Sequence, residues 1–220
     1  ASPAEIITAW GRLGYPRRAL RLHAAAQIIA EDFDNQVPED PAILQTLPGI
    51  GEYTAAAIAA FAFEKQTLVM DVNIRRLLTR VIDGNEHPKP APTVKEKASR
   101  LALQPTKNAH IWAAATMELG ALVCTSKNPI CEQCPVIGQC NWRKNGYPKT
   151  DLVRKSQDWH GTDRKCRGTI VQALRENESL TESAIKKLWP DESQVEKALK
   201  TLQDDLLIEA IPRKRYRLPA

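Results

Sequence analysis

The sequence has no long hydrophobic run and no export leader. Nothing in its 220 residues approaches the ~20 consecutive apolar residues that a bilayer-spanning helix requires. The opening residues, ASPAEIITAW, lack the basic-then-apolar order of a secretory signal. We therefore expect no membrane segment and a cytoplasmic location. The first residue is Ala rather than Met, which predicts that the natural start lies upstream.

Cysteine is scarce outside one short segment. Four of the five cysteines fall between Cys124 and Cys140, and Cys166 stands apart. An even group of thiols in a chain without an export signal indicates a metal site rather than disulfides. We expect the isolated Cys166 to be a partly buried thiol.

The overall composition is that of a globular protein with a basic surplus. Hydrophobic residues make up 43% and charged residues 26%, and 220 residues suffice for one large or two modest domains. The formal net charge of +5 favours a polyanionic partner. Charge alone does not identify that partner, because many basic proteins never bind nucleic acid.

Residues 1–145 carry apolar side chains at helical spacing and no strand pattern, which predicts an all-α first domain. A polar, basic and non-periodic stretch begins at about Trp142, and we take residues 146–164 as a linker. The expected helices of the first domain end near Trp10 and span 18–31, 42–46, 54–63, 72–81, 94–103 and 109–122.

Beyond the linker, residues 165–220 predict a small α+β module. Helical periodicity covers 166–175, 181–188 and 194–202, and strand-like segments at 206–211 and 216–218 flank a basic turn. Three helices followed by a β-hairpin are typical of a winged helix. Such a module binds DNA through its third helix and wing, or docks a protein, and the sequence leaves both open.

The segment Leu47-Pro48-Gly49-Ile50-Gly51 lies between two expected helices. Gly49 and Gly51 let the backbone turn sharply and approach a ligand closely. The following helix begins at about Glu52, so its N–H groups and positive dipole end suit a phosphate. Such a contact positions a protein on DNA without reading sequence. The alternative is an ordinary tight turn between two helices.

Asp71 precedes the next helix and allows two roles. Aspartate is a common N-cap, so a purely structural role is the simpler one. A carboxylate fixed beside a sugar also stabilises the positive charge that develops when an N-glycosidic bond breaks. The two roles are compatible, because one oxygen can cap the helix while the other faces the sugar.

The segments LPGIGEYTAAAIAAFAF and MDVNIRRLLTR together resemble the helix-hairpin-helix, the Gly/Pro-rich loop and the catalytic aspartate of the endonuclease III superfamily of DNA glycosylases. The resemblance implies that Asp71 is essential. It also implies that Asn73 organises the site, as in the adenine-specific members.

The residue at the position of Tyr53 distinguishes bifunctional from monofunctional members of that superfamily. Bifunctional members carry a lysine at this place, whose amine attacks the sugar. Tyrosine cannot do so, and the resemblance therefore implies a monofunctional hydrolase. It also implies that Tyr53 and the adjacent Thr54 contact the substrate DNA.

The segment Trp10-Gly11-Arg12-Leu13-Gly14-Tyr15 resembles a loop that inserts side chains into the base stack in adenine-specific members. Leu13 and Tyr15 would then offset the cost of unstacking when the base is flipped out. The chain departs from the pattern at Arg12, where glycine is usual, and at Pro16, where a second aromatic is usual. The alternative is that Leu13 and Tyr15 are core residues at a helix end.

The four clustered cysteines, Cys124, Cys131, Cys134 and Cys140, have the spacing C-x6-C-x2-C-x5-C. Four thiolates this close hold either a zinc ion or an iron–sulfur cubane. Zinc ribbons usually use two CxxC pairs, whereas this unequal spacing resembles the [4Fe-4S] loop of the endonuclease III superfamily. The resemblance therefore implies a [4Fe-4S] cluster, with zinc as the alternative.

These expectations combine into one hypothesis. The resemblance implies a monomeric, nucleoid-associated adenine DNA glycosylase of bacterial base excision repair, acting on double-stranded DNA with adenine opposite 8-oxoguanine or guanine. In that family a glutamate upstream of the Trp10 segment is the general acid, and only nine residues precede Trp10 here.

We therefore expect this chain to bind DNA and to excise little base. The region after residue 165 is too short for the usual C-terminal domain that reads 8-oxoguanine. A thymine or other mismatch glycosylase, a non-catalytic DNA-binding relative and a zinc-dependent transcription factor remain as alternatives.

Overall fold

The computed structural model describes residues 1–150 and 161–220, which belong to two compact units. One unit is Val37–Val153, and the other joins Ala1–Gln36 to Arg154–Ala220. The sequence-based division into 1–145, a linker and 165–220 stays a prediction. The structure groups the first 36 residues with the C-terminal elements, because Ile7 is fully buried in their core. Among the described residues, no helix has the length and apolar character needed to cross a membrane.

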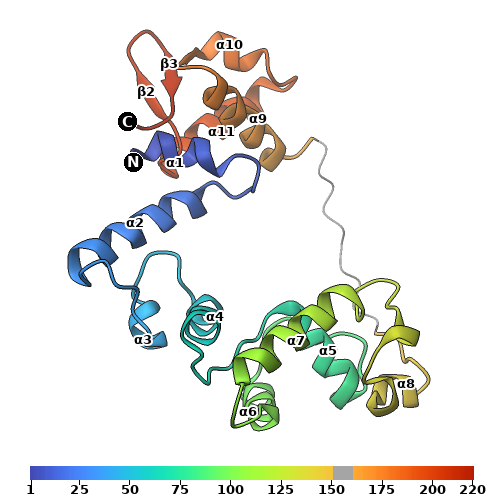
Figure 1. The fold of residues 1–220 in the computed structure, drawn as a ribbon. Helices are drawn as coiled ribbons and strands as arrows, with labels where there is room; N and C mark the ends of the chain where they lie inside the picture. Colours follow the sequence, from blue (N-terminus) through green and yellow to red (C-terminus); the bar gives the residue numbers. More distant parts are fainter. Residues whose placement is uncertain (151–160) are drawn as a thin grey trace. The chain divides into compact units, whose positions relative to one another are not determined.

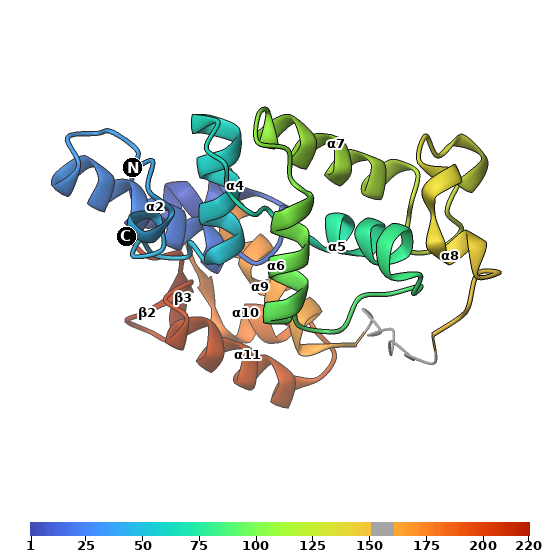
Figure 2. The ribbon, with the colours of Figure 1, turned by 90° about the horizontal axis from the view of Figure 1, so that it is seen from below.

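In its described part, the Val37–Val153 unit has helices joined by loops and no strand. Its central pair is α5 and α7, which lie side by side (Figures 1 and 2). Their contact is close because α4, α5 and α7 meet through mainly small or aliphatic side chains, including Ala56, Ala60, Ile74 and Ala113. The helices are α3 (Pro41–Leu44), α4 (Glu52–Phe63), α5 (Val72–Leu78), α6 (Val94–Leu103), α7 (Ala109–Leu122) and α8 (Asn141–Lys144), with a π-helical turn at Thr79–Asp83 and 3-10 turns at Cys131–Gln133 and Ile137–Gln139.

The other unit packs two N-terminal helices with the C-terminal elements. Its core includes Ile7 of the first helix together with Ile170, Ile185, Val195 and Leu207. A three-stranded antiparallel sheet has the order β1-β3-β2, and Tyr216 pairs with both Leu180 and Ala210. The elements are α1 (Pro3–Trp10), α2 (Arg17–Asp32), α9 (Asp163–Glu176), β1 (Leu180–Thr181), α10 (Glu182–Lys186), α11 (Glu192–Asp204), β2 (Glu209–Ile211) and β3 (Arg215–Arg217).

Several expected boundaries differ from the structure. The helix expected at 72–81 ends as α5 at Leu78 and continues as a π-helical turn to Asp83. The polar stretch expected from Trp142 begins later, because Trp142 is buried in α8. The strand β1 was not expected, since two residues carry no alternation pattern. Most of the expected linker, residues 151–160, lies outside the described residues.

Candidate functional site

The glycine turn before α4 has the backbone geometry expected of it. Gly49 has φ +80°, a left-handed conformation that favours glycine, and the Ile50 N–H donates to the Leu47 carbonyl at 3.2 Å. Gly51 is the N-cap of α4 and offers no side-chain oxygen to the first turn. The N–H groups that open α4 are therefore left for another acceptor, and an anion fits that position.

Asp71 is the N-cap of α5 and uses both carboxylate oxygens. Oδ1 accepts from the Ile74 N–H at 2.6 Å, and Oδ2 accepts from Nδ2 of Asn73 at 2.8 Å. The side chain is half-buried rather than enclosed in hydrocarbon. The carboxylate is thus held in one orientation by two donors while remaining within reach of a ligand.

Tyr53, in the first turn of α4, is close enough to Asp71 for the charge of the carboxylate to act on it. Burial raises the pKa of the Tyr53 hydroxyl, and the negative charge of Asp71 raises it further. Ala56 and Ala60 of α4 also pack in one core cluster with Ile74 of α5, so the two helices are neighbours. Tyr53 itself is 44% exposed. Thr54 is half-buried in the same turn.

Asn73 connects Asp71 to a buried arginine through hydrogen bonds. The Asn73 Oδ1 accepts from Nη2 of Arg76 at 2.9 Å. The Arg76 guanidinium also donates through Nε to the Cys124 carbonyl at 2.8 Å and through Nη2 to the Gly120 carbonyl at 2.5 Å. A connected set of hydrogen bonds therefore runs from the Asp71 carboxylate to the backbone of the first clustered cysteine.

Gly120 makes the α5–α7 contact possible. A Cβ at this position would lie 2.6 Å from the carbonyl oxygen of Asn73. A methyl carbon and a carbonyl oxygen do not pack that closely, so any larger residue would separate the two helices at Asn73.

Arg80 is the main contact of the cysteine segment with the helices. Its side chain is 1% exposed, and Nη1 donates to the Cys124 Sγ at 3.3 Å and to the Thr125 carbonyl at 2.8 Å. Its own carbonyl accepts from the Cys140 Sγ at 3.7 Å. The guanidinium also stacks 4.5 Å from the centre of the Trp142 ring. One arginine therefore contacts two of the four thiols.

The four clustered thiols line one cavity. Cys124, Cys131, Cys134 and Cys140 share it with Arg80, Trp142 and six further residues. Burial raises the pKa of the Cys134 thiol; the Val136 N–H opposes this, and the other three cysteines raise the pKa further. In the described chain, no group of three or more His, Cys, Asp or Glu side chains is placed to hold a metal ion. Cys166 is fully buried in the other unit, more completely than expected.

The predicted wedge residues lie in the unit that contains the C-terminal elements. Leu13 is 72% exposed and Tyr15 is 59% exposed, in the loop between α1 and α2. The indole N–H of Trp10 donates to the Gly14 carbonyl at 2.9 Å and closes this loop. Leu13 and Tyr15 are therefore not core residues, so the alternative interpretation of these two residues is wrong.

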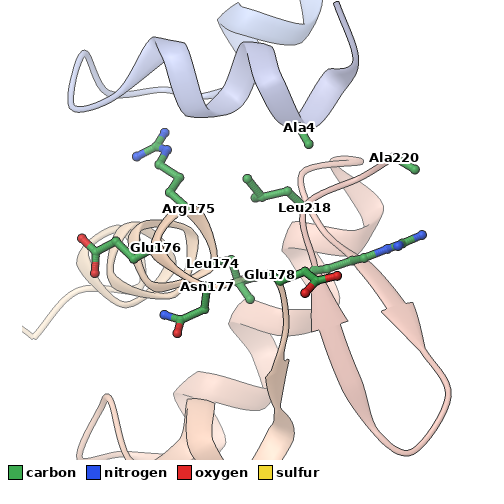
Figure 3. A pocket seen from close by; sticks show the side chains of 9 residues that line it. Ala4, Leu174, Arg175, Glu176, Asn177, Glu178, Leu218 and Ala220 are labelled. Atoms are coloured by element: carbon green, nitrogen blue, oxygen red, sulfur yellow. The ribbon is translucent and has the colours of Figure 1, made fainter.

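A cavity of about 360 Å³ also lies in this unit, between α1, the end of α9 and the C-terminal residues (Figure 3). Charged side chains of both signs line it, among them Arg175, Glu176, Glu178 and Arg217. None of the residues predicted to bind substrate or metal belongs to it.

Sequence reasoning singled out neither Arg76, Arg80 nor Gly120. The signal for Gly120 was a glycine inside a strong helical pattern, which usually has a packing reason. The arginines gave no signal, since a helix with Arg75, Arg76 and Arg80 is ordinarily assumed to present them to solvent.

Comparison with known proteins finds a matching motif model and similar proteins. A model of the helix-hairpin-helix motif matches residues 32–61. The adenine DNA glycosylase of Mycolicibacterium smegmatis is 42% identical over 220 residues, which cover 99% of this chain and 74% of that protein. The one from Mycobacterium tuberculosis H37Rv is also 42% identical, covering 100% and 73%. The human one is 40% identical over 147 residues, 66% of this chain and 27% of the human protein.

Solved structures share the fold at low identity. A thermostable thymine-DNA glycosylase superposes with a TM-score of 0.59 at 24% identity, covering 66% of this chain and 67% of that one. Endonuclease III in a non-covalent DNA complex gives a TM-score of 0.58 at 19% identity, covering 67% and 69%.

Proposed function

Because the chain belongs to the adenine DNA glycosylase family, we propose that it acts on double-stranded DNA and hydrolyses the N-glycosidic bond of adenine mispaired with 8-oxoguanine or guanine. The observation that carries the proposal is the Asp71 carboxylate at the N-cap of α5, which Asn73 and the Ile74 N–H hold in one orientation. Hydrolysis of an N-glycosidic bond in DNA requires a fixed carboxylate at the sugar and a site that binds a neighbouring phosphate.

Asp71 stabilises the sugar cation in this proposal. Breaking the bond to the base develops positive charge on the anomeric carbon, and a preoriented carboxylate lowers the energy of that state. Asn73 holds the carboxylate through its 2.8 Å hydrogen bond, so it is a positioning residue. Water is the nucleophile, because Tyr53 has no amine with which to form a Schiff base.

The turn at Gly49 and Gly51 binds a DNA phosphate near the target nucleotide. The N–H groups that open α4 lack a capping side chain, and the dipole of this twelve-residue helix favours an anion there. Glu52 is also in this turn, but its carboxylate is paired with Lys97 at 2.5 Å. That pairing offsets the repulsion which Glu52 would otherwise exert on a phosphate.

Cys124, Cys131, Cys134 and Cys140 would hold a [4Fe-4S] cluster. All four line one cavity, and four neighbouring thiolates repel one another unless cations lie between them. A cubane binds each thiolate to a different iron and so suits ligands spread around a cavity better than one zinc ion does. A cluster bound by these cysteines would supply a rigid cross-link. Arg80 holds Cys124 by a hydrogen bond, and Trp142 packs against the Arg80 guanidinium.

The C-terminal elements form a winged-helix-like module that meets DNA through its wing. The turn between β2 and β3 exposes Arg213 and Lys214, both in left-handed backbone conformations. The third helix, α11, is less suited, because it carries Glu192, Glu196 and Asp204 among its lysines. Of these two elements, the wing is the more basic and the better suited to a phosphate.

The test of the function is a panel of otherwise identical duplexes. Binding of the 220-residue chain is measured by fluorescence anisotropy on adenine opposite 8-oxoguanine, adenine opposite guanine, thymine opposite guanine, and a matched duplex. We expect the two adenine mispairs to bind most tightly. Slow single-turnover excision is expected to give alkali-labile sites at the adenine.

Two results would contradict the proposal. Tightest binding to the thymine mismatch would indicate the thymine-directed alternative. Strand cleavage without alkali would indicate a lyase, which Tyr53 does not allow.

A further inference from the structure

Tyr15 is covered on one side by an arginine from the C-terminal elements. The guanidinium carbon of Arg164, in α9, lies 4.2 Å from the centre of the Tyr15 ring. This is well within the ~6 Å reach of a cation–π contact. The tyrosine nevertheless stays 59% exposed, so much of its ring surface remains accessible.

The loop that carries Tyr15 is built to hold this ring in place. Tyr15 itself has φ +47°, a conformation that costs energy in a residue other than glycine. The Trp10 indole N–H bonds the Gly14 carbonyl, and the Arg18 guanidinium lies 5.8 Å from the Trp10 ring centre. A strained residue held by its surroundings is typical of a functional position.

The same loop is anchored to the C-terminal elements by further contacts. The Ile7 side chain of α1 is fully buried against residues of α9, and its carbonyl accepts from Nε of Arg175 at 3.0 Å. At the start of α2, Arg17 pairs with Asp205 at 3.1 Å, and the same carboxylate is also paired with Arg167 of α9. The loop and α9 therefore belong to one packed body.

We propose that Arg164 is a positioning residue that presents Tyr15 to DNA and so couples the C-terminal module to opening of the base stack. The proposal rests on the proposed function and on the sequence-based expectation that Tyr15 enters the base stack. An arginine on one face fixes the ring before binding, so less conformational freedom is lost on insertion. The exposed part of the ring is then the surface on which a base stacks.

The experiment is a double-mutant cycle read by 2-aminopurine placed next to the mispaired adenine. The emission of this base rises when it unstacks, so saturated emission measures stack opening separately from affinity. Arg164→Ala is expected to lower the saturated emission and to weaken binding about two- to fivefold. In a Tyr15→Ala background the same change is expected to add no further loss.

Two further variants separate positioning from charge and folding. Arg164→Lys keeps the positive charge but loses the planar stacking group, so we expect its saturated emission to fall as well. Lys187→Ala removes one charge from an exposed site on the same module and is expected to leave the emission unchanged. Thermal unfolding of each variant checks that the fold is retained.

The inference would be overturned if Arg164→Ala lowered the saturated emission equally in the wild-type and Tyr15→Ala backgrounds. It would also be overturned if the Arg164→Ala variant had the emission of the wild-type chain. If the wild-type chain binds the duplex without raising the emission, the wedge role of Tyr15 itself fails. The first two results would contradict only the role of Arg164 and leave the proposed function unchanged. The third would contradict the premise that Tyr15 enters the base stack, so the two kinds of failure are distinguishable.

Discussion

At the scale of single residues, Asp71 fills the capping role that its sequence position allowed, and its role beside a sugar stays a proposal. One oxygen caps α5 through the Ile74 N–H, and the other is held by Asn73. Neither contact uses the carboxylate as an ion-pair partner, so its negative charge remains available to a cationic sugar. The same charge acts on Tyr53, which makes the proximity of α4 and α5 measurable without any enzymatic assay.

Asp71→Asn is expected to lower the pKa of Tyr53 toward, but not to, its ordinary value. Burial is the larger cause of the raised pKa and persists in the variant, whereas the charge of Asp71 is lost. Asparagine is also a good N-cap, so α5 should remain folded. Titration of tyrosinate absorbance measures the change, with Tyr53→Phe identifying the signal. An unchanged Tyr53 titration would show that the two side chains are not neighbours.

Gly120→Ala is expected to lower the free energy of unfolding by about 1–3 kcal/mol, because its Cβ would meet the Asn73 backbone. Gly168→Ala is the matched control, since Gly168 lies in α9 and a Cβ there would meet nothing within 4 Å. That substitution should be neutral or stabilise by up to about 1 kcal/mol. Urea unfolding of both variants makes the comparison, and equal effects would contradict the close α5–α7 approach.

At the scale of elements, α5 and the turn after it connect the candidate active site to the cysteine segment. Its N-cap is Asp71, and its buried face carries Arg75, Arg76 and, one turn further, Arg80. Arg75 pairs with Glu96 of α6 through two hydrogen bonds, which lowers the pKa of that glutamate. Arg75 thus joins α5 to α6, whereas Arg76 and Arg80 both join α5 and its continuation to the cysteine segment at Cys124. A buried guanidinium requires several acceptors, which these contacts supply.

Arg80→Met is expected to reduce the amount of cluster retained by the purified protein and to lower its thermal stability. Methionine fills a similar volume but donates no hydrogen bonds to the Cys124 thiol or the Thr125 carbonyl. Brown visible absorbance per mole of anaerobically purified protein is the measurement. Lys127→Met, on the exposed surface of the same segment, is the control and should retain normal absorbance. Iron analysis with a zinc assay decides between the cubane and zinc.

At the scale of the whole molecule, the proposed DNA contacts are distributed over two compact units. The hairpin turn, Asp71 and the cysteines belong to one, and the Tyr15 loop and the basic wing belong to the other. The mycobacterial relatives match over nearly the full chain, so residues beyond 165 are part of the shared architecture. We therefore expect the affinity for DNA to depend on charges in both units.

Replacing both wing cations, in Arg213→Gln/Lys214→Gln, is expected to reduce the slope of log affinity against log salt by about 2. Each exposed cation that neutralises a phosphate releases close to one counterion, and the two residues occupy one exposed turn. The control is Lys187→Gln/Lys200→Gln, which removes the same charge from exposed positions at the end of α10 and on α11. Equal slopes for the two double variants would contradict a wing contact and favour protein docking.

The sequence by itself determined the local features of this protein. Helical periodicity predicted α6 and α7 with their observed bounds, and the glycine turn and Asp71 indicated where α4 and α5 begin. These features depend on residues that are close in the chain, where backbone sterics and capping act. Only the tertiary structure decided the contacts of Arg76, Arg80, Gly120 and Arg164, and the grouping of residues 1–36 with the C-terminal elements. Their partners lie far away in the chain, and no local pattern specifies which distant group a buried arginine or a helical glycine will meet.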